Sequence, residues 1–224
     1  MANWLITGAN RGIGLELARR AREEGQRLIV TARKPKEASE LAALGVDVRA
    51  LDVASDESVS ALARDLAGVP IDVLVNNAGV MGRSVPFESI DTAEILRTID
   101  INALGALRVT RALLPNLRLG RGRKVAQMTS KMGSIADNTS GGAYAYRMSK
   151  AALNMMNKSL ALDLSSEGFV CLVLHPGWVR TKMGGTNAPL EPSESASGLY
   201  EVIANAKSSA NGSFLDWRGE QIPW

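Results

Sequence analysis

The chain has 224 residues, 46% of them hydrophobic and 22% charged, which is ordinary for a globular protein and sufficient for one α/β domain with a large core. The net charge is only +3, from 26 Lys and Arg against 23 Asp and Glu, and gives little support for nucleic-acid binding. A single cysteine, Cys171, excludes an internal disulfide and a Cys-rich metal site, and the lack of a leader-like start or a long apolar run favours a cytoplasmic protein without a membrane span.

Taken in chain order, short apolar runs alternate with helix-forming segments. Strands are predicted at Trp4–Thr7, Leu28–Thr31, Val46–Leu51, Ile71–Val75, Val125–Thr129, Val170–Leu174 and Phe214-Leu215. Helices are predicted at Ile13–Glu24, Glu37–Leu44, 55–66, 91–117 (two helices or one interrupted helix), from Tyr146 to near Glu167, and at Glu194–Ala206. The alternation predicts an α/β fold: a single-domain, Rossmann-type, doubly wound parallel β-sheet over residues 1–224, flanked by helices on both faces.

A glycine-rich turn, Thr7-Gly8-Ala9-Asn10-Arg11-Gly12-Ile13-Gly14, lies between the first predicted strand and the first helix. At this place in an α/β sheet, the free backbone N–H groups of the helix N-terminus face the phosphates of a nucleotide. Glycines permit the tight turn and the close approach of the backbone to the ligand. The residues predicted to bind a dinucleotide here are Gly8, Asn10, Arg11, Gly12 and Ile13.

The end of the second strand indicates which dinucleotide is bound. Sites that prefer NAD carry a carboxylate there to bind the ribose 2′-hydroxyl, whereas Thr31-Ala32-Arg33-Lys34 contains no acid. Arg33 and Lys34, together with Arg11 from the glycine-rich turn, could bind a 2′-phosphate instead. The sequence therefore favours NADP(H) over NAD(H), although some of these cations could simply be solvated.

Tyr146 and Lys150 are four residues apart in a segment of good helix formers, so they are expected on one face of a helix. A phenol titrates near ~10, and a cation held beside it favours the phenolate. The pair is therefore a candidate for proton transfer. On these two residues alone, an ordinary helix with a packed tyrosine and a solvated lysine is the preferred interpretation, and only the other motifs of the chain reverse that preference.

Several motifs in this order resemble the short-chain dehydrogenase/reductase family along nearly the whole chain. The motifs are Thr7–Gly14, Asp52-Val53, Asn76–Gly79, Asn102, Ser130, the Tyr146/Lys150 pair and Pro176-Gly177. Within the family, the chain is similar to the carbonyl-reductase-like or C-factor-like branch. The narrower similarity depends on the segments 146–154 and 175–181 and on the terminal Ile222-Pro223-Trp224.

The resemblance implies four catalytic residues. Tyr146 would be the general acid in carbonyl reduction and the general base in alcohol oxidation, and Lys150 would bind the nicotinamide ribose and lower the pKa of the phenol. Ser130 would hydrogen-bond to the substrate oxygen. Asn102 would interrupt its helix and hold a water that passes protons to Lys150. Ser130 lies sixteen residues before Tyr146, which predicts a long loop at 134–142 and leaves Ser134 as an alternative contact for the substrate oxygen.

The resemblance also implies further cofactor contacts. Asp52 and Val53 would lie near the adenine, although a turn-forming role for Asp52 is as compatible with the sequence. The remaining residues are Asn76, Ala78 and Gly79 along the ribose, and Pro176, Gly177, Val179 and Thr181 near the carboxamide and phosphates.

The predicted function is that of an NADP(H)-dependent oxidoreductase, which moves a hydride between nicotinamide and a carbonyl or secondary alcohol. Two alternatives stay open: a non-catalytic NADP(H)-binding signalling or regulatory protein, and an enone, quinone or imine reductase. His175 is the only histidine, so no metal site based on histidines is expected. Apolar residues on more than one face of Leu104–Leu117 and Ala151–Leu162, together with the family resemblance, predict a homodimer or homotetramer. A monomer whose own loops cover these faces stays open as the alternative. Loop residues, rather than these motifs, determine the small-molecule substrate.

Overall fold

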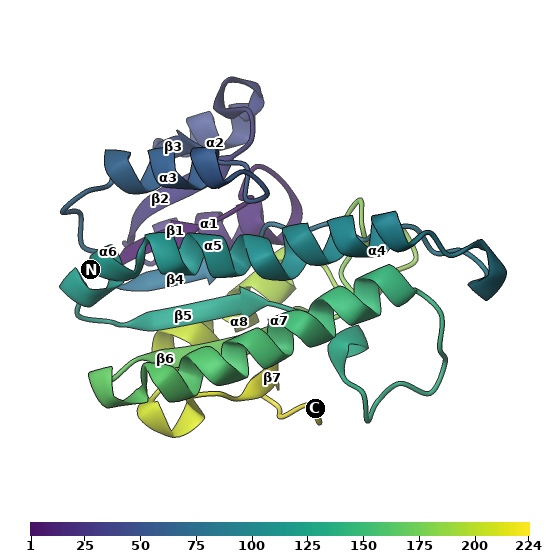
Figure 1. Cartoon of the computed structure of the whole chain (residues 1–224). Helices are drawn as coiled ribbons and strands as arrows, with labels where there is room; N and C mark the ends of the chain where they lie inside the picture. The colour runs from purple at the N-terminus through teal and green to yellow at the C-terminus, as the bar shows by residue number, and fades with distance from the viewer.

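Seven parallel strands form one sheet in the computed structural model, which describes residues 1–224 (Figure 1). The strands are β1 (Asn3–Ile6), β2 (Arg27–Ala32), β3 (Asp47–Ala50), β4 (Val73–Asn76), β5 (Lys124–Met128), β6 (Val170–His175) and β7 (Phe214–Asp216). Their order is β3-β2-β1-β4-β5-β6-β7, so the winding direction reverses between β1 and β4. In open parallel sheets, ligands bind at such a reversal, beyond the carboxyl ends of the strands. The predicted doubly wound α/β fold is confirmed.

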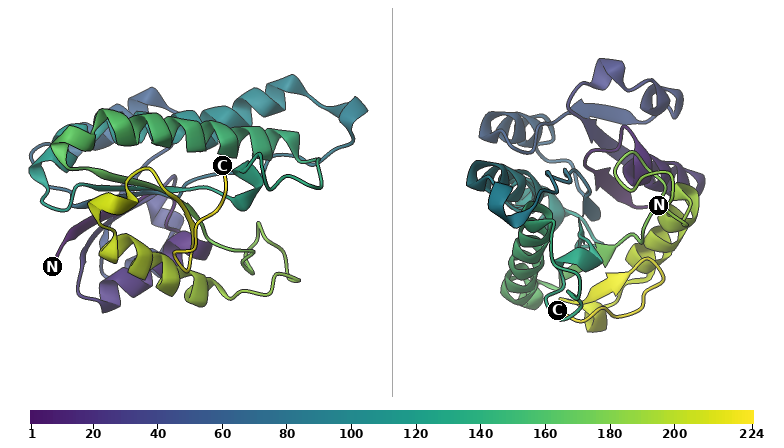
Figure 2. Two further views of the ribbon diagram at one scale, coloured as in Figure 1. Left: turned by 90° about the horizontal axis from the view of Figure 1, so that it is seen from below. Right: turned by 90° about the vertical axis from the view of Figure 1, so that its right-hand side faces the viewer.

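Helices cover both faces of the sheet. They are α1 (Gly12–Glu23), α2 (Ser39–Ala43), α3 (Asp56–Asp65), α4 (Thr92–Ile99), α5 (Gly105–Ala112), α6 (Leu114–Leu119), α7 (Tyr144–Asp163) and α8 (Pro192–Asn205). Helices α1 and α8 pack against one face, and α3, α5 and α7 pack against the other (Figure 2). Measured against the length and apolar character that a bilayer requires, none of these helices qualifies as a membrane span.

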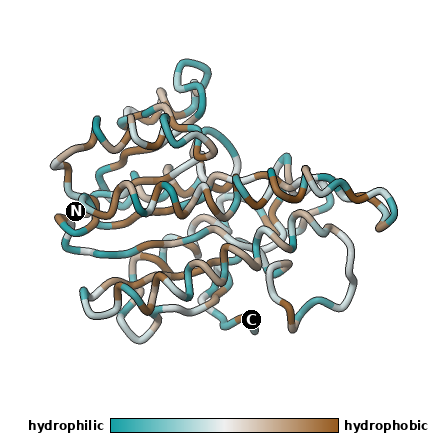
Figure 3. The backbone as a smooth tube through the Cα atoms, in the orientation of Figure 1, coloured by the Kyte–Doolittle hydropathy of each residue, from teal (hydrophilic) through white to brown (hydrophobic).

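Alternation along each strand divides the core between the two faces. In β1, Trp4 and Ile6 belong to the cluster beneath α1 and α8, whereas Leu5 points into the cluster beneath α3, α5 and α7. The Trp4 ring stacks on Tyr200 of α8 with 5.3 Å between the ring centroids. Full burial of a side chain such as Leu5 contributes about 1.5–3 kcal/mol. Hydrophobic and hydrophilic positions also alternate along the helices, as expected for elements with one buried face (Figure 3).

Two helix boundaries differ from the prediction. Helix α7 ends at Asp163 rather than near Glu167, because a 3-10 turn over Ser165–Glu167 follows and Gly168 adopts the left-handed conformation with φ +79°. The predicted helix at Glu37–Leu44 divides into a 3-10 turn at Pro35–Glu37 and the short α2. In both places a local turn satisfies the backbone groups that a longer helix would have paired.

The densest cluster of basic residues in the sequence extends from the end of α6 to the start of β5 and consists of Arg118, Arg121, Arg123 and Lys124. Arg118 forms an ion pair with Glu167 at 2.7 Å. The Lys124 ammonium donates to the carbonyl of Ile203, at the C-terminal end of α8, at 3.0 Å. A cation at a helix C-terminus is stabilised by the helix dipole. These contacts give the two cations a role in the fold.

Candidate active site

The turns after β1 and β4 are joined at the reversal point of the sheet. The Asn77 amide donates to the carbonyls of Thr7 and Gly8 at 2.9 and 3.1 Å, and the Thr7 hydroxyl accepts from the backbone N–H groups of Asn77 and Ala78. Gly8 has φ +64°, and a Cβ atom there would lie 2.9 Å from the Ala78 Cα. Only glycine fits this position. Thr7 and Asn77 were not among the predicted site residues, although both lie inside motifs that were recognised.

The N-terminus of α1 has free backbone donors. Helix α1 begins at Gly12, its N-cap residue Arg11 makes no side-chain capping bond, and its first turn has no acidic residue. A Cβ atom at Gly14 would lie 2.4 Å from the Asn77 side-chain nitrogen, so the helix start is packed against the second turn. Unpaired N–H groups and the positive end of the helix dipole suit a phosphate. The predicted neighbours Asn10 and Ile13 are exposed and half-buried, respectively.

The cations predicted to bind a 2′-phosphate lie on the surface beside this turn. The Thr31 carbonyl, next to the end of β2, accepts from Ala9 N at 2.9 Å, which places Arg33 close to the glycine-rich turn. Arg11 and Arg33 are exposed and form no ion pair. Lys34 differs, because its ammonium is paired with Glu37 at 2.9 Å.

Three of the predicted cofactor contacts have partners within the protein. Asp52 is exposed, and its carboxylate accepts from Ala54 N at 3.1 Å, so it forms a turn. Val53 is buried against Gly105. The Asn76 amide donates to Thr110 and Gln127 at 2.9 and 3.0 Å, beneath α5. The side-chain oxygen of Asn76 is buried and has no hydrogen-bond partner.

Tyr146 and Lys150 lie on one buried face of α7. Their exposed fractions are only 8% and 5%, and the Lys150 ammonium lies 5.6 Å from the centroid of the Tyr146 ring. The same ammonium donates to the carbonyl of Met128, the last residue of β5, at 2.7 Å. The alternative of a solvated lysine is therefore wrong.

Burial shifts the pKa values of Tyr146 and Lys150 in the directions that favour their neutral forms. It raises the pKa of Tyr146 above its ordinary value of 10.0, while a hydrogen bond with Ser130 acts in the opposite direction. It lowers the pKa of Lys150 from 10.5 to about 8. The expectation that Lys150 lowers the pKa of the phenol is not met in this structure: burial raises that pKa, only Ser130 acts against burial, and the Lys150 ammonium donates to the Met128 carbonyl.

The structure distinguishes the two candidate serines. Ser130 follows β5, and its side chain is the one that acts on the pKa of the Tyr146 phenol, in the lowering direction. The Ser134 hydroxyl is 2% exposed and accepts from Asp137 N at 3.0 Å, inside the long loop that precedes α7. Ser130 is therefore the serine that adjoins the candidate acid.

Asn102 lies where the predicted helix is interrupted. A π-helical turn at Asp100–Leu104 separates α4 from α5, which confirms the predicted interruption. The Asn102 amide accepts from Val80 N at 2.8 Å, and it donates to Val80 O at 2.8 Å and to Ser149 Oγ at 2.9 Å. Ser149 in turn donates to the Tyr146 carbonyl at 2.8 Å. Asn102 thus joins the chain after β4 to the turn of α7 that carries the tyrosine.

Gly79 brings these groups together with the glycine-rich turn. A Cβ atom at Gly79 would lie 3.0 Å from Asn102 Oδ1 and 3.8 Å from the Lys150 ammonium. Ala78, the preceding residue, packs against Gly8. A ligand that lies along the glycine-rich turn and passes Gly79 would therefore reach Lys150 and Tyr146 directly.

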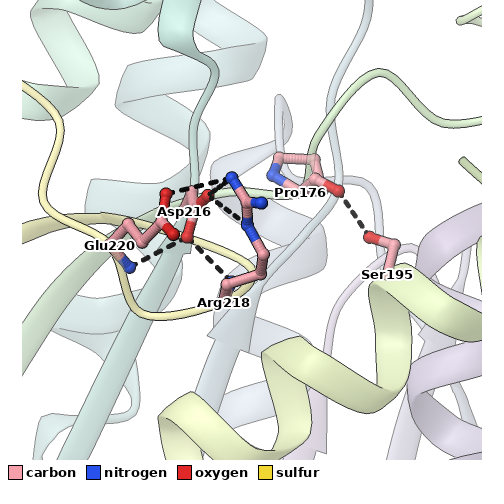
Figure 4. Close-up of polar contacts among 5 residues, drawn as sticks. All are labelled: Pro176, Ser195, Asp216, Arg218 and Glu220. Carbon is pink, nitrogen blue, oxygen red and sulfur yellow. Dashed lines mark hydrogen bonds and ion pairs between the residues drawn. The ribbon is translucent and has the colours of Figure 1, made fainter.

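The segment after β6 closes the other side of this region. The Pro176 carbonyl accepts from the buried Ser195 of α8 at 2.6 Å (Figure 4). Val179 forms an isolated β-bridge with Leu190, and the Thr181 methyl group lies 3.5 Å from the position of a Cβ atom on Gly12. The segment therefore extends from the end of β6 to the glycine-rich turn.

Gly177 and the turn after β7 complete this wall. Gly177 has φ +88°, and a Cβ atom there would lie 2.6 Å from the Leu190 side chain, so this position requires glycine. Beside it, Asp216 accepts from the backbone N–H groups of Arg218 and Glu220 at 2.8 and 2.9 Å and fixes the turn that follows β7 (Figure 4).

Comparison with known proteins agrees with this geometry. Residues 2–191 match the family described as short chain dehydrogenase. The chain belongs to the short-chain dehydrogenase/reductase family. It is 52% identical to the C-signal protein of Myxococcus xanthus over 164 residues, covering 73% of this chain and 99% of that protein.

Solved structures extend the similarity to the whole chain. The carbonyl reductase Sniffer of D. melanogaster is 34% identical and superposes with a TM-score of 0.96 over 100% of both chains. An NADPH-bound carbonyl reductase from chicken fatty liver is 30% identical with a TM-score of 0.92, covering 100% of this chain and 99% of that one. The predicted similarity to the carbonyl-reductase-like or C-factor-like branch is confirmed, and the chain is an oxidoreductase of this family.

Proposed function

We propose that the protein is an NADP(H)-dependent reductase of carbonyl compounds. The observation that carries the proposal is the meeting of Tyr146, Lys150 and Ser130 in one buried place, which Gly79 connects to the glycine-rich turn. Buried, pKa-shifted groups in a crevice at the reversal point of a sheet are typical of catalytic sites. The carbonyl reductases among the similar structures support the reaction class.

The cofactor side of the proposal depends on the shape of the two joined turns. The close approach of Gly8 to Ala78 and the uncapped start of α1 fit a pyrophosphate, and the unpaired Arg11 and Arg33 fit a 2′-phosphate. Val179 and Thr181 would contact the nicotinamide end, and Lys150 would hydrogen-bond to its ribose. Bound NADPH supplies the hydride that reduces the carbonyl carbon.

The chain itself supplies the proton. Because burial raises the pKa of Tyr146, the phenol is protonated at neutral pH and can donate to the oxygen of a carbonyl as that oxygen gains negative charge. Ser130 would donate a second hydrogen bond to the same oxygen. The positive charge of Lys150, and of an oxidised nicotinamide ring, would favour the phenolate that remains. Asn102 would hold the water through which Lys150 exchanges protons with solvent.

The decisive test is the consumption of NADPH and of NADH with a panel of ketones, aldehydes, enones and quinones. Tyr146→Phe should lower turnover with NADPH about 10²- to 10⁴-fold, because it removes the acid while keeping the ring. Tyr200→Phe is the matched control, since its hydroxyl bonds to Gln26 on the opposite face of the sheet. A Tyr146→Phe enzyme that keeps most of its activity would exclude this mechanism.

Two other functions are outcomes of the same panel. The 52% identity with a protein named C-signal favours, as a second candidate, an NADP(H)-binding signalling protein that performs no catalysis. Tight NADPH binding without turnover of any acceptor would support that candidate. Turnover confined to enones, quinones or imines would assign the protein to a different acceptor class on the same site.

We further propose that a second copy of the chain covers α4 and α7, which lie side by side (Figure 2). Met148, Met155 and Leu162 are seven residues apart, so they form one stripe on α7, and their exposed fractions are 46%, 68% and 65%. Leu96 of α4 adds a side chain that is 67% exposed. Sedimentation that shows a single 23.8 kDa species would contradict a dimer or tetramer.

A further inference from the structure

A third polar residue continues the buried face of α7. Asn154 follows Lys150 by four residues, as Lys150 follows Tyr146, and its exposed fraction is 3%. A buried amide that uses both its donor and its acceptor offsets the loss of its hydrogen bonds to water. Asn154 uses both on a single neighbouring segment, the turn that follows β5.

The two bonds of Asn154 lie on either side of Ser130. Its oxygen accepts from the Thr129 hydroxyl at 2.6 Å, and its nitrogen donates to the Gly133 carbonyl at 3.3 Å. Thr129 immediately precedes Ser130, and Gly133 ends the turn that Ser130 begins. Figure 1 shows this turn beneath the N-terminal half of α7.

Hydrogen bonds within the turn hold its conformation, and the turn packs directly against α7. Gly133 N donates to the Ser130 carbonyl at 2.8 Å, and Met132 N donates to the Ser130 hydroxyl at 3.2 Å. A Cβ atom on Gly133 would lie 2.9 Å from Lys150 Cβ, so no side chain could separate the turn from α7. The position of Ser130 relative to α7 therefore depends on the contacts at both ends of the turn.

We propose that Asn154 is a positioning residue, which fixes the position of the Ser130 hydroxyl relative to the Tyr146 side chain by binding the Ser130 turn at both ends. The inference rests on the proposed function, because it assigns Ser130 and Tyr146 to the same carbonyl oxygen. Asn154 touches neither substrate nor cofactor in this scheme.

The chemistry of the amide explains why asparagine is required. A carboxylate at this position could accept from Thr129 but would face the Gly133 carbonyl without a proton to donate. Leucine has a similar size but could do neither. Displacement of a reacting group by about 1 Å can reduce turnover about 100-fold.

The test is Asn154→Leu, with Asn157→Leu as the matched control. Asn157 lies on the same helix and is completely buried, but its amide atoms have no hydrogen-bond partner, so its replacement removes an amide without removing a bond. For Asn154→Leu we expect kcat for carbonyl reduction to fall about 10- to 100-fold with little change in the Kd of NADPH. For Asn157→Leu we expect both values to stay near those of the wild type.

A change in the titration of Tyr146 separates positioning from general destabilisation. The hydrogen bond with Ser130 lowers the pKa of the Tyr146 phenol, so a displaced Ser130 should let that pKa rise. The absorbance of the phenolate reports this pKa, as the difference between each protein and its Tyr146→Phe counterpart. We expect an upward shift in Asn154→Leu and none in Asn157→Leu.

Thr129 supplies an independent arm of the test. Thr129→Val keeps the shape but removes the donor, and should reproduce part of the Asn154→Leu defect, whereas Thr129→Ser restores the donor and should recover most of it. The double variant Thr129→Val/Asn154→Leu should be no worse than Asn154→Leu alone, because both changes break the same bond.

The outcomes distinguish the two proposals. If the wild type turns over no carbonyl, or Tyr146→Phe stays active, the proposed function fails, and the titration of Tyr146 still decides whether Asn154 positions Ser130. If Asn154→Leu and Asn157→Leu have the same kcat and the same phenol pKa, the positioning role is overturned.

Discussion

The two halves of the site are built in opposite ways. Around Tyr146 and Lys150 the polar groups are buried and bound to other groups of the chain, whereas around Arg11 and Arg33 the charged groups are exposed and unpaired. A buried group that must act on a substrate needs its position fixed beforehand. A cation that must bind a phosphate needs its donors free. On the proposed function, the fold itself fixes the groups that would transfer a proton, whereas the free cations would gain their partner only from the nucleotide.

The first prediction concerns the removal of single hydroxyls from the buried half. Ser130→Ala should lower turnover about 100-fold or more, because it removes a donor to the substrate oxygen and the hydrogen bond to Tyr146. Ser134→Ala should stay close to the wild type, since the Ser134 hydroxyl serves the backbone of its own loop. Steady-state rates with NADPH measure both. A larger loss in Ser134→Ala would reverse the assignment of the two serines.

The second prediction concerns the free energy that burial of Lys150 costs. The pKa of Lys150 is about 8 in the folded protein against 10.5 ordinarily, so between these pH values the unfolded chain binds more protons than the folded one. This contribution to stability is therefore lowest below pH 8 and rises as the pH approaches 10.5. The gain from pH 7 to pH 10 should be on the order of 2 kcal/mol.

Urea unfolding of the wild type and of Lys150→Met at both pH values isolates this effect. The free energy of unfolding of the wild type minus that of Lys150→Met should increase from pH 7 to pH 10. Arg33→Met is the matched control from the exposed half, where a cation without burial should leave that pH dependence unaltered. An equal response of the two variants would remove the contrast between the halves.

The sequence predicted the groups of each half better than the contacts between them. Strand alternation was sufficient for the fold, because the fold follows from local periodicity. The Gly8, Gly12 and Gly14 spacing predicts the nucleotide turn from information of the same local kind, the freedom of the backbone. The helix spacing of Tyr146 and Lys150 likewise placed them on one face. These properties need no knowledge of which segments meet in space.

The missed residues are those whose role depends on long-range pairing. Asn77 bonds to Thr7 across 70 positions and Asn154 bonds to Thr129 across 25, so neither role is visible in a local pattern. The pKa of Tyr146 was wrongly expected to be lowered, because its value depends on burial, and burial is a property of the packed structure. Asn76 stays a prediction beside the ribose, and the bonds of its amide nitrogen to Thr110 and Gln127 follow only from the packed structure.

The third prediction tests the exposed half directly. Arg33→Ala should weaken NADPH binding about 10-fold or more and leave NADH binding unchanged, because only NADPH carries the 2′-phosphate. Arg11→Ala should act in the same direction. Titration of each nucleotide by fluorescence at two salt concentrations measures the effect, which should shrink as salt screens the charges. Equal losses for both nucleotides would place these cations elsewhere on the cofactor.

The smallest expected effect belongs to Lys34, the neighbour of Arg33. Its ammonium is already paired with Glu37, and a phosphate would have to compete with that carboxylate for it. Lys34→Ala should therefore change the Kd of NADPH by no more than about twofold, in keeping with the small free energies of exposed ion pairs. Glu37→Gln frees the ammonium and should tighten NADPH binding if Lys34 can reach the 2′-phosphate. A large loss of NADPH affinity in Lys34→Ala would show instead that the Lys34–Glu37 ion pair opens when the nucleotide binds. A cation would then not need to be unpaired in the free protein in order to bind the 2′-phosphate.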